Sequence, residues 1–212
     1  MPPTPARNPR LPRRERRESL LNAAREVFVE SGFHAAAMDD IAGRAGVTKP
    51  VLYQHFGSKQ DLYLAVLDAG VEDVVTAVGK GLQSSPDNRS RVAATMDAYL
   101  GFMAQKDEVY RLVFESDLVN LPAVRERIEQ VNERCARMVS QVIAEDTGLS
   151  AQESCLLAHG LIGLAQTAAR QWLHRPGGLD RPDAAHLLAS LAWRGISGFP
   201  KNRAAARPTA TP

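Results

Sequence analysis

Residues 38–56 read MDDIAGRAGVTKPVLYQHF, and this stretch decides the fold. Its apolar residues up to Ala45 recur three and four positions apart, which predicts a short helix that ends at Gly46. Thr48 can cap a second helix, and Pro50 suits the first turn of that helix. This is the spacing of a helix-turn-helix, in which the second helix enters the DNA major groove. A plain helical hairpin has the same spacing, so spacing alone leaves both interpretations open.

The second helix of this stretch is expected to turn a polar face outward. Its apolar face comprises Val47, Leu52 and Phe56. The opposite face carries a cation, a proline, a phenol and an amide, on Lys49, Pro50, Tyr53 and Gln54. Such groups are suited to phosphates and to base edges.

Helical periodicity extends over most of the chain, and no strand pattern of comparable strength appears. One amphipathic helix precedes residue 31, and another begins after a cap at Ser58 and runs to residues 79–81. Further helices are expected at 88–105, 107–118, 122–146, 150–174 and 183–197. We therefore expect an all-α protein. The expected segments are a disordered basic arm over 1–12, the helix-turn-helix domain over 13–60, the helical domain over 61–198 and a disordered tail over 199–212.

The positive charge is concentrated at the front of the chain. Residues 1–17 carry a net charge of +5, whereas the whole chain of 212 residues carries only +2. A basic arm ahead of a folded body is typical of a protein that meets nucleic acid or an anionic membrane surface. A solvated tail without a role is the alternative.

The motifs of the common enzyme classes are missing from the sequence. It has no HExxH, no GxSxG, no glycine-rich phosphate loop and no paired Cys and His. Cys135 and Cys155 are expected to be two small buried hydrophobes rather than a metal or redox pair. We expect no catalytic residue, no metal and no cofactor. Because no apolar run approaches the roughly 18–20 residues of a membrane span, we expect a cytoplasmic protein without a membrane partner.

Residues 13–68, and especially VFVESGFHAAAMDDIAGRAGVTKPVLYQHFGSKQDLYLAVLD, resemble the N-terminal domain of the TetR family of transcriptional regulators. The resemblance implies a homodimer whose recognition helices dock in successive major grooves of a near-palindromic operator in double-stranded DNA. It also implies an N-terminal helix-turn-helix DNA-binding domain and a C-terminal helical ligand-binding and dimerisation domain. A small molecule bound in the C-terminal domain would change the separation of the two recognition helices.

The family pattern, carried over to this sequence, implies contacts with phosphates and with base edges. The phosphate positions are Thr48, Tyr53, His55 and Lys59. The base-edge positions are Lys49, Pro50 and Val51. Gln54 and Arg44 complete the expected DNA-binding set. Val51 alternatively fills the helix interface, and His55 is alternatively a surface histidine.

The chain departs from the family pattern just before the first helix of the motif. The family commonly has Thr or Ser there, as cap and phosphate ligand, whereas this chain has Ala35, Ala36 and Ala37. Asp39 and Asp40 would partly replace the cap through the helix dipole, yet they repel DNA if they face it.

The C-terminal half is similar to mycobacterial members of this family that regulate fatty-acid synthase genes and sense long-chain acyl-CoA. The stretches that carry this similarity are AYLGFMAQKDEVYRLVFESDLVN, IAEDTGLS and LAWRGIS. They predict a small hydrophobic effector, with long-chain acyl-CoA as the candidate, in an apolar channel. The expected lining comprises Tyr99, Phe102, Met103, Tyr110, Arg111, Phe114, Met138, Arg170 and Trp172. Large apolar residues at helical spacing also form plain core, and Arg111 and Arg170 meet either a head group or an acid such as Glu115.

Residues 156–169 combine leucines with small residues, so that helices can approach closely. They are expected to form the two-fold bundle that joins protomers, together with residues 187–192. The expected interface comprises Leu157, Gly160, Leu161, Gly163, Leu164, Ala168, Leu188 and Leu191. His159 is expected to be a satisfied interface residue.

Two other functions compete with this interpretation. One is a TetR-type repressor that responds to another hydrophobic ligand, such as a drug or metabolite, and the other is a helical protein-interaction module.

Overall fold

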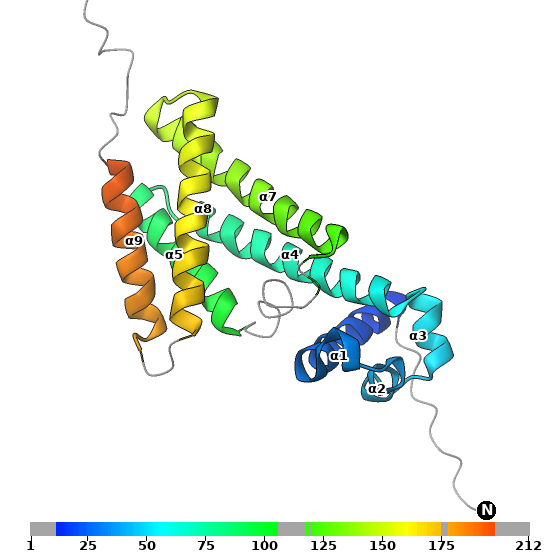
Figure 1. Cartoon of the computed structure of the whole chain (residues 1–212). Coiled ribbons are helices and arrows are strands. Elements are labelled where there is room, and N and C mark those ends of the chain that lie inside the picture. The colour runs from blue at the N-terminus through cyan, green and yellow to red at the C-terminus, as the bar shows by residue number, and fades with distance from the viewer. Residues whose placement is uncertain (1–11, 106–117, 119, 175–177, 198–212) are drawn as a thin grey trace, which may run out of the picture.

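The computed structural model describes residues 12–105, 118, 120–174 and 178–197 (Figure 1). Within these residues every regular element is a helix, which confirms the all-α expectation. The helices are α1 (Arg13–Ala35), α2 (Met38–Arg44), α3 (Lys49–His55), α4 (Lys59–Gln83), α5 (Asn88–Gln105), α7 (Pro122–Thr147), α8 (Ala151–Leu173) and α9 (Arg181–Ser197). The expected tail lies outside the described residues, as do the arm except Pro12 and the helix over 107–118 except Leu118.

Serine caps begin two of the long helices. The Ser58 hydroxyl accepts a hydrogen bond from the Asp61 backbone N–H at 3.0 Å, as the sequence predicted for the start of α4. Ser150 and Glu153 form a reciprocal capping box at the start of α8. Thr48 occupies the cap position of α3, but its side chain makes no capping hydrogen bond, so that part of the sequence prediction is wrong.

The helix α1 extends further than its sequence predicted. The expected end at residues 31–32 is a break at Gly32, after which the helix continues to Ala35. The next helices begin and end within about two residues of their expected bounds. This agreement follows from the apolar spacing, because each helix buries one stripe against its neighbours.

The 25-residue helix α4 is the spine of the molecule. Figure 1 shows its first turns against α1, at the end of the molecule that also holds α2 and α3, and its later turns between α5 and α7. Side chains of α4 belong to two buried clusters. One cluster joins α1, α2, α3 and α7 to the first turns of α4 and includes Leu20, Phe28, Ile41, Leu52, Tyr63 and Val124. The second joins α4 to α7 and includes Val71, Val78, Val131 and Cys135.

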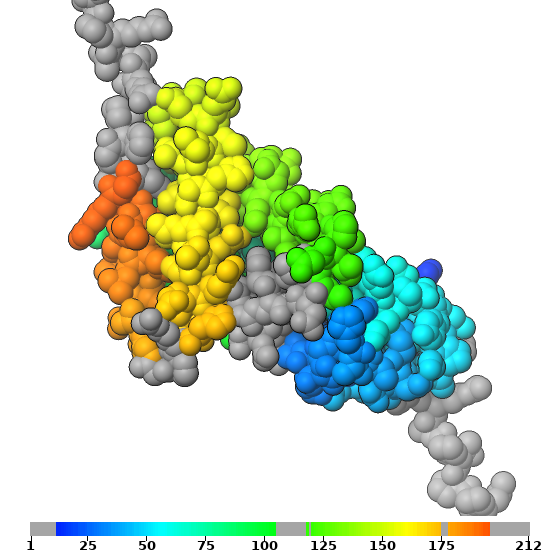
Figure 2. All heavy atoms as spheres, viewed as in Figure 1, coloured from blue at the N-terminus to red at the C-terminus, as the bar shows by residue number. Residues whose placement is uncertain are grey.

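The helices α8 and α9 cover the end of the molecule far from α2 and α3 (Figure 2). An ion pair between Arg181 and Asp97, at 2.8 Å, ties α9 to α5.

Cys135 is buried as expected, but Cys155 is exposed, so the prediction of two buried cysteines is wrong for Cys155. Its position on the outer side of α8 explains this exposure. None of the described helices is long and apolar enough to cross a membrane.

The close approach of α4 and α5 depends on Gly81. A Cβ atom at this position would lie 2.5 Å from the Cα atom of Thr95, so Gly81→Ala must push the two helices apart. We expect a loss of about 1–3 kcal/mol in the free energy of unfolding, measured by denaturant titration with circular dichroism.

Gly79 provides the control for this prediction. Among the described residues outside its own helix, a Cβ atom there meets only the Met138 sulfur, at 3.8 Å. Because alanine favours a helix interior, Gly79→Ala should stabilise the protein by up to about 1 kcal/mol. Equal stability of the two variants would contradict the close approach at Gly81.

Candidate nucleic-acid interface and apolar cavity

The turn between α2 and α3 sets the direction of α3. Gly46 has φ of 66°, a left-handed conformation that glycine adopts readily. The Val47 backbone N–H donates to the Ala42 carbonyl at 2.9 Å and closes the turn. Leu52 and Phe56 are buried in the shared core, so the opposite face of α3 is left at the surface.

Most of the expected DNA-contacting residues lie on this outer face. Tyr53 is 43% exposed, although it is a large aromatic residue. Thr48, Lys49, Pro50 and Gln54 are also exposed. Val51 and His55 are half-buried at the edges of the face. The outer side of α3 therefore offers a hydroxyl, an ammonium, a phenol and an amide.

Two basic side chains of the helix-turn-helix are held by acids of the same domain. The Lys49 ammonium donates to the Asp39 carboxylate at 2.8 Å, and this hydrogen bond raises the pKa of Lys49. Arg44 donates two hydrogen bonds of 2.6 Å to Glu30. Glu26 lies 3.6 Å from the same guanidinium. The pKa of Arg44 is raised, chiefly by its hydrogen bonds to Glu30.

Lys59 has a structural task in addition to its expected phosphate contact. Its ammonium donates to the carbonyls of His34 and Ala36, at 3.1 and 2.9 Å. It also lies 4.7 Å from the centre of the Phe33 ring, within range of a cation–π interaction. Lys59 therefore fastens the start of α4 to the end of α1.

A group of arginines from the start of α1 lies near the end of α3. The pKa of His55 is lowered, first by burial and then by the positive charges of Arg13, Arg16 and Arg17. The Arg17 guanidinium also lies 4.8 Å from the centre of the Phe56 ring. The arginines of α1 were not among the expected DNA-contacting residues. The high positive charge of residues 1–17 was the sequence feature that could have identified them.

A cavity of about 110 Å³ lies among α4, α5, α7 and α8. Its wall is apolar except for Thr95, Asn132 and Gln166. The Gln166 side-chain amide donates to the Asn132 amide oxygen, so α8 and α7 are hydrogen-bonded at the wall. The apolar wall includes Gly70, Val71, Val74, Val78, Leu82, Val92, Met96, Tyr99, Phe102, Met103, Val131, Cys135, Val139, Leu161, Ile162, Ala165 and Ala192.

Three of the expected pocket residues, Tyr99, Phe102 and Met103, line this cavity. Three others lie outside its wall: Met138 packs beside it, Arg170 is exposed, and the Trp172 indole N–H donates to the Leu179 carbonyl at 2.8 Å. Tyr110, Arg111 and Phe114 lie outside the described residues. Asn132 and Gln166 were not predicted to line the pocket, because a single amide on a helix gives no pocket signal.

The thiol of Cys135, which lines the cavity, is unreactive at neutral pH. Burial raises the pKa of Cys135 to about 11, and the neighbouring Arg134 lowers it by a smaller amount. The thiol therefore stays protonated at neutral pH and acts as a small apolar wall residue.

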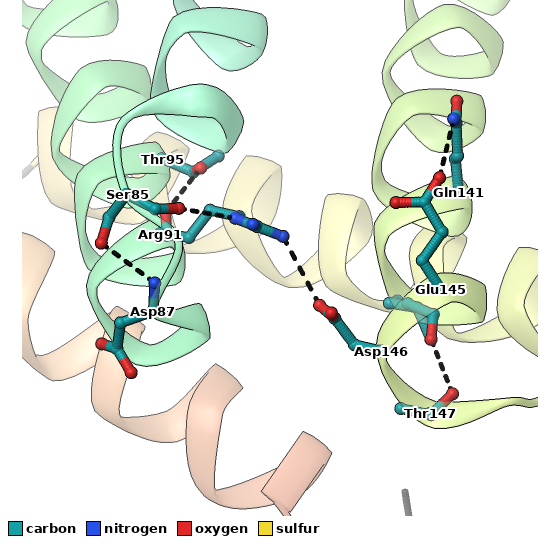
Figure 3. Close-up of polar contacts among 9 residues, drawn as sticks. Ser85, Asp87, Arg91, Thr95, Gln141, Glu145, Asp146 and Thr147 are labelled. Atoms are coloured by element: carbon teal, nitrogen blue, oxygen red, sulfur yellow. Dashed lines mark hydrogen bonds and ion pairs between the residues drawn. The ribbon is translucent and has the colours of Figure 1, made fainter.

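Polar contacts hold the α4–α5 turn against α5 and the end of α7 (Figure 3). Arg91 donates to the Ser85 carbonyl at 3.1 Å and lies 3.5 Å from the Asp146 carboxylate of α7. One turn further along α5, the Thr95 hydroxyl donates to the Arg91 carbonyl at 2.8 Å. These contacts join α5 to the α4–α5 turn and to α7, next to the cavity-lining residue Val92.

The outer faces of α8 and α9 expose apolar residues. Leu156, Leu187 and Leu191 are 74%, 54% and 59% exposed. Gly160 and Gly163 are exposed as well, with open space where a Cβ atom would lie. The other expected interface residues are half-buried within the chain, namely Leu157, Leu161, Leu164, Ala168 and Leu188. His159 is exposed on the same helix, with Nδ1 2.9 Å from the Cys155 carbonyl oxygen.

Known proteins share both the fold and much of the sequence. A family signature described as "Bacterial regulatory proteins, tetR family" matches residues 20–66. The HTH-type transcriptional activator FasR of Mycolicibacterium smegmatis is 44% identical over 197 residues, which cover 93% of this chain and 90% of that protein.

Two crystal structures have the same arrangement of helices. A TetR-like transcriptional regulator from Rhodococcus sp. RHA1 is 28% identical with a TM-score of 0.70, covering 89% of this chain and 100% of that one. A tetR-family regulator from Streptomyces coelicolor is 18% identical, so it bears on the fold alone. Its TM-score is 0.72, and the match covers 95% of this chain and 94% of that one.

Proposed function

Because the chain belongs to the tetR family, whose members are DNA-binding transcriptional regulators, we propose that it works as a homodimer whose operator affinity responds to a long-chain acyl-CoA. The observation that carries the proposal is the exposed polar face of α3 at one end of α4, with an apolar cavity along the rest of α4.

The outer face of α3 would contact DNA in the major groove. Lys49 has donors for guanine O6 and N7, and Thr48 and Tyr53 have hydroxyls for phosphate oxygens. The arginines at the start of α1 would add charge beside the same groove. Backbone contacts of this kind position the protein, whereas base contacts select the sequence.

We expect Lys49→Ala to weaken operator binding by roughly 1–3 kcal/mol and to relax the preference at one position in each half-site, if Lys49 contacts a guanine. Tyr53→Phe should weaken binding to any sequence, because it removes a phosphate donor. Binding is measured by fluorescence anisotropy on duplexes selected by the wild-type protein. Lys80→Ala, an exposed lysine in the last turn of α4, is the control. Unchanged affinity and base preference in both α3 variants would refute this role.

The exposed leucines of α8 and α9 would pack against the same residues of a second copy. A two-fold interface is self-complementary, and the glycines of α8 would let the two α8 helices approach closely. Such a dimer would hold the two α3 helices at the spacing of successive major grooves, which is about 34–36 Å.

Gly163→Trp should convert the dimer to a monomer, as measured by sedimentation. The monomer should remain folded, because no described residue beyond the adjacent turns of α8 lies within 4 Å of a Cβ atom at Gly163. Operator affinity should fall with the dimer. Gly163→Ala adds little volume and should remain dimeric. A dimeric Gly163→Trp variant would place the interface elsewhere.

The cavity favours a long apolar chain as the effector. Its wall offers three polar side chains among seventeen others that are apolar, so ligand affinity would come from burying hydrocarbon. Each buried CH₂ group contributes about 0.8 kcal/mol. The likeness of the C-terminal half to acyl-CoA-sensing members of the family supports the same class.

Operator affinity should change increasingly as acyl-CoA chain length rises, until the cavity is filled. The change in operator affinity cannot exceed the factor by which the ligand binds one dimer conformation more tightly than the other, which is typically about 5- to 150-fold. Val78→Phe should shorten the longest effective chain, because Val78 lines the cavity. Val75→Phe, on the same helix but outside the cavity wall, is the control. No effect at any length, or the same effect at all lengths, would assign the cavity to another hydrophobic ligand.

A further inference from the structure

The pair between Lys49 and Asp39 joins the first turn of α3 to the first turn of α2. The ammonium and carboxylate are 2.8 Å apart, with side chains 48% and 66% exposed. The two residues are ten positions apart in the sequence, and the turn at Gly46 brings them together. Lys49 is the residue proposed above to contact a base, and Asp39 is an acid on the same surface.

This ion pair contributes little to stability, because water already solvates both of its exposed charges. Its larger effect is on what Lys49 can bind. An ammonium has three N–H donors, and Asp39 accepts from one of them, which leaves two. The carboxylate also cancels most of the positive charge that would attract a phosphate.

Phosphates and guanines respond differently to such a change. A phosphate attracts lysine chiefly through charge, and any DNA sequence offers phosphates in the same pattern. Guanine O6 and N7 attract it through hydrogen bonding, which needs two suitably placed donors. A carboxylate bound to lysine therefore weakens the first interaction more than the second.

We propose that Asp39 is a specificity-determining residue that acts through Lys49. It lowers the affinity of Lys49 for phosphates on any sequence and leaves two donors for a guanine in the operator. Asp39 is thus a positioning residue, and this role rests on the proposed contact of Lys49 with a base. Asp39 therefore increases the ratio of operator affinity to affinity for other sequences, besides repelling DNA.

Asp40 provides a matched control. It has the same charge in the same first turn of α2, so it has a similar effect on the helix dipole and on the repulsion of DNA. Its charge acts on Arg44, whose pKa it helps to raise, whereas Lys49 is hydrogen-bonded to Asp39. Simple repulsion of DNA would therefore appear equally in Asp39→Asn and Asp40→Asn.

The experiment measures dissociation constants for two duplexes over a range of salt concentrations. One duplex is selected by the wild-type protein from a random pool, and the other is a shuffled duplex of the same composition. The proteins are the wild type, Asp39→Asn, Asp40→Asn, Lys49→Ala and the double variant Asp39→Asn with Lys49→Ala. Thermal melting of each variant checks the fold, and Asp39→Glu tests rescue by a retained carboxylate.

Asp39→Asn should bind the shuffled duplex about two- to fivefold more tightly, the range expected from an exposed ion pair. Its log–log salt slope on that duplex should steepen by up to about 0.9, because one more phosphate contact forms. The selected duplex should gain less, so that the specificity ratio falls. Asp39→Glu should restore the ratio, and the effect of Asp39→Asn should vanish in the Lys49→Ala background.

Four results would overturn the proposal: an equal gain on both duplexes, the same change in Asp40→Asn, a gain that persists without Lys49, or no change on either duplex. Failure of the proposed DNA contact itself gives a different result, since Lys49→Ala alone would then leave the selected duplex unaffected.

Discussion

The packing of Tyr63 against α1 is the contact on which the rest of the structure depends. Tyr63 is fully buried in the first turns of α4, and its ring lies 5.3 Å from Phe28 and 5.2 Å from Phe33. Edge-to-face contacts of this kind contribute beyond the area that they bury. Lys59, one turn earlier, adds its hydrogen bonds to the carbonyls at the end of α1. The helix-turn-helix is therefore fixed to α4, whose next turns form the cavity wall.

This arrangement gives a physical route between the cavity and α3. A ligand can change DNA affinity only if it binds one conformation of the dimer better than the other. Between the cavity and the helix-turn-helix, two ion pairs at the surface tie α7 to α4. They join Arg127 to Asp68 and Arg134 to Glu72. The helix α7 also packs on α4 through the buried residues Val71, Val78, Val131 and Cys135. Because the Tyr63 cluster fixes the helix-turn-helix to α4, a rearrangement that moved α4 would carry the helix-turn-helix along with it.

Local pattern was sufficient to predict the helices and the outer face of α3. Apolar spacing gave the helix positions, Ser58 marked the start of α4, and the turn between α2 and α3 oriented Tyr53 and Lys49. What escaped prediction depends on residues far apart in the chain. The Gln166–Asn132 pair spans 34 positions, and Lys59 binds carbonyls 23 and 25 positions away. A helical pattern also cannot say which side of α8 faces outward, so Cys155 was placed wrongly.

The charges around α3 divide into two groups, and the division bears on how DNA would be chosen. Lys49 and Arg44 are each countered by acids of their own domain. At the start of α1, the positive charges of Arg13, Arg16 and Arg17 reach the end of α3, where they add to burial, the larger cause, in lowering the pKa of His55. Phosphates respond to that positive charge whatever the sequence, while base edges respond to the geometry of donors. The affinity for DNA of any sequence would therefore come chiefly from α1. The choice between sequences would come from the face of α2 and α3, where acids of the same domain pair with Lys49 and Arg44.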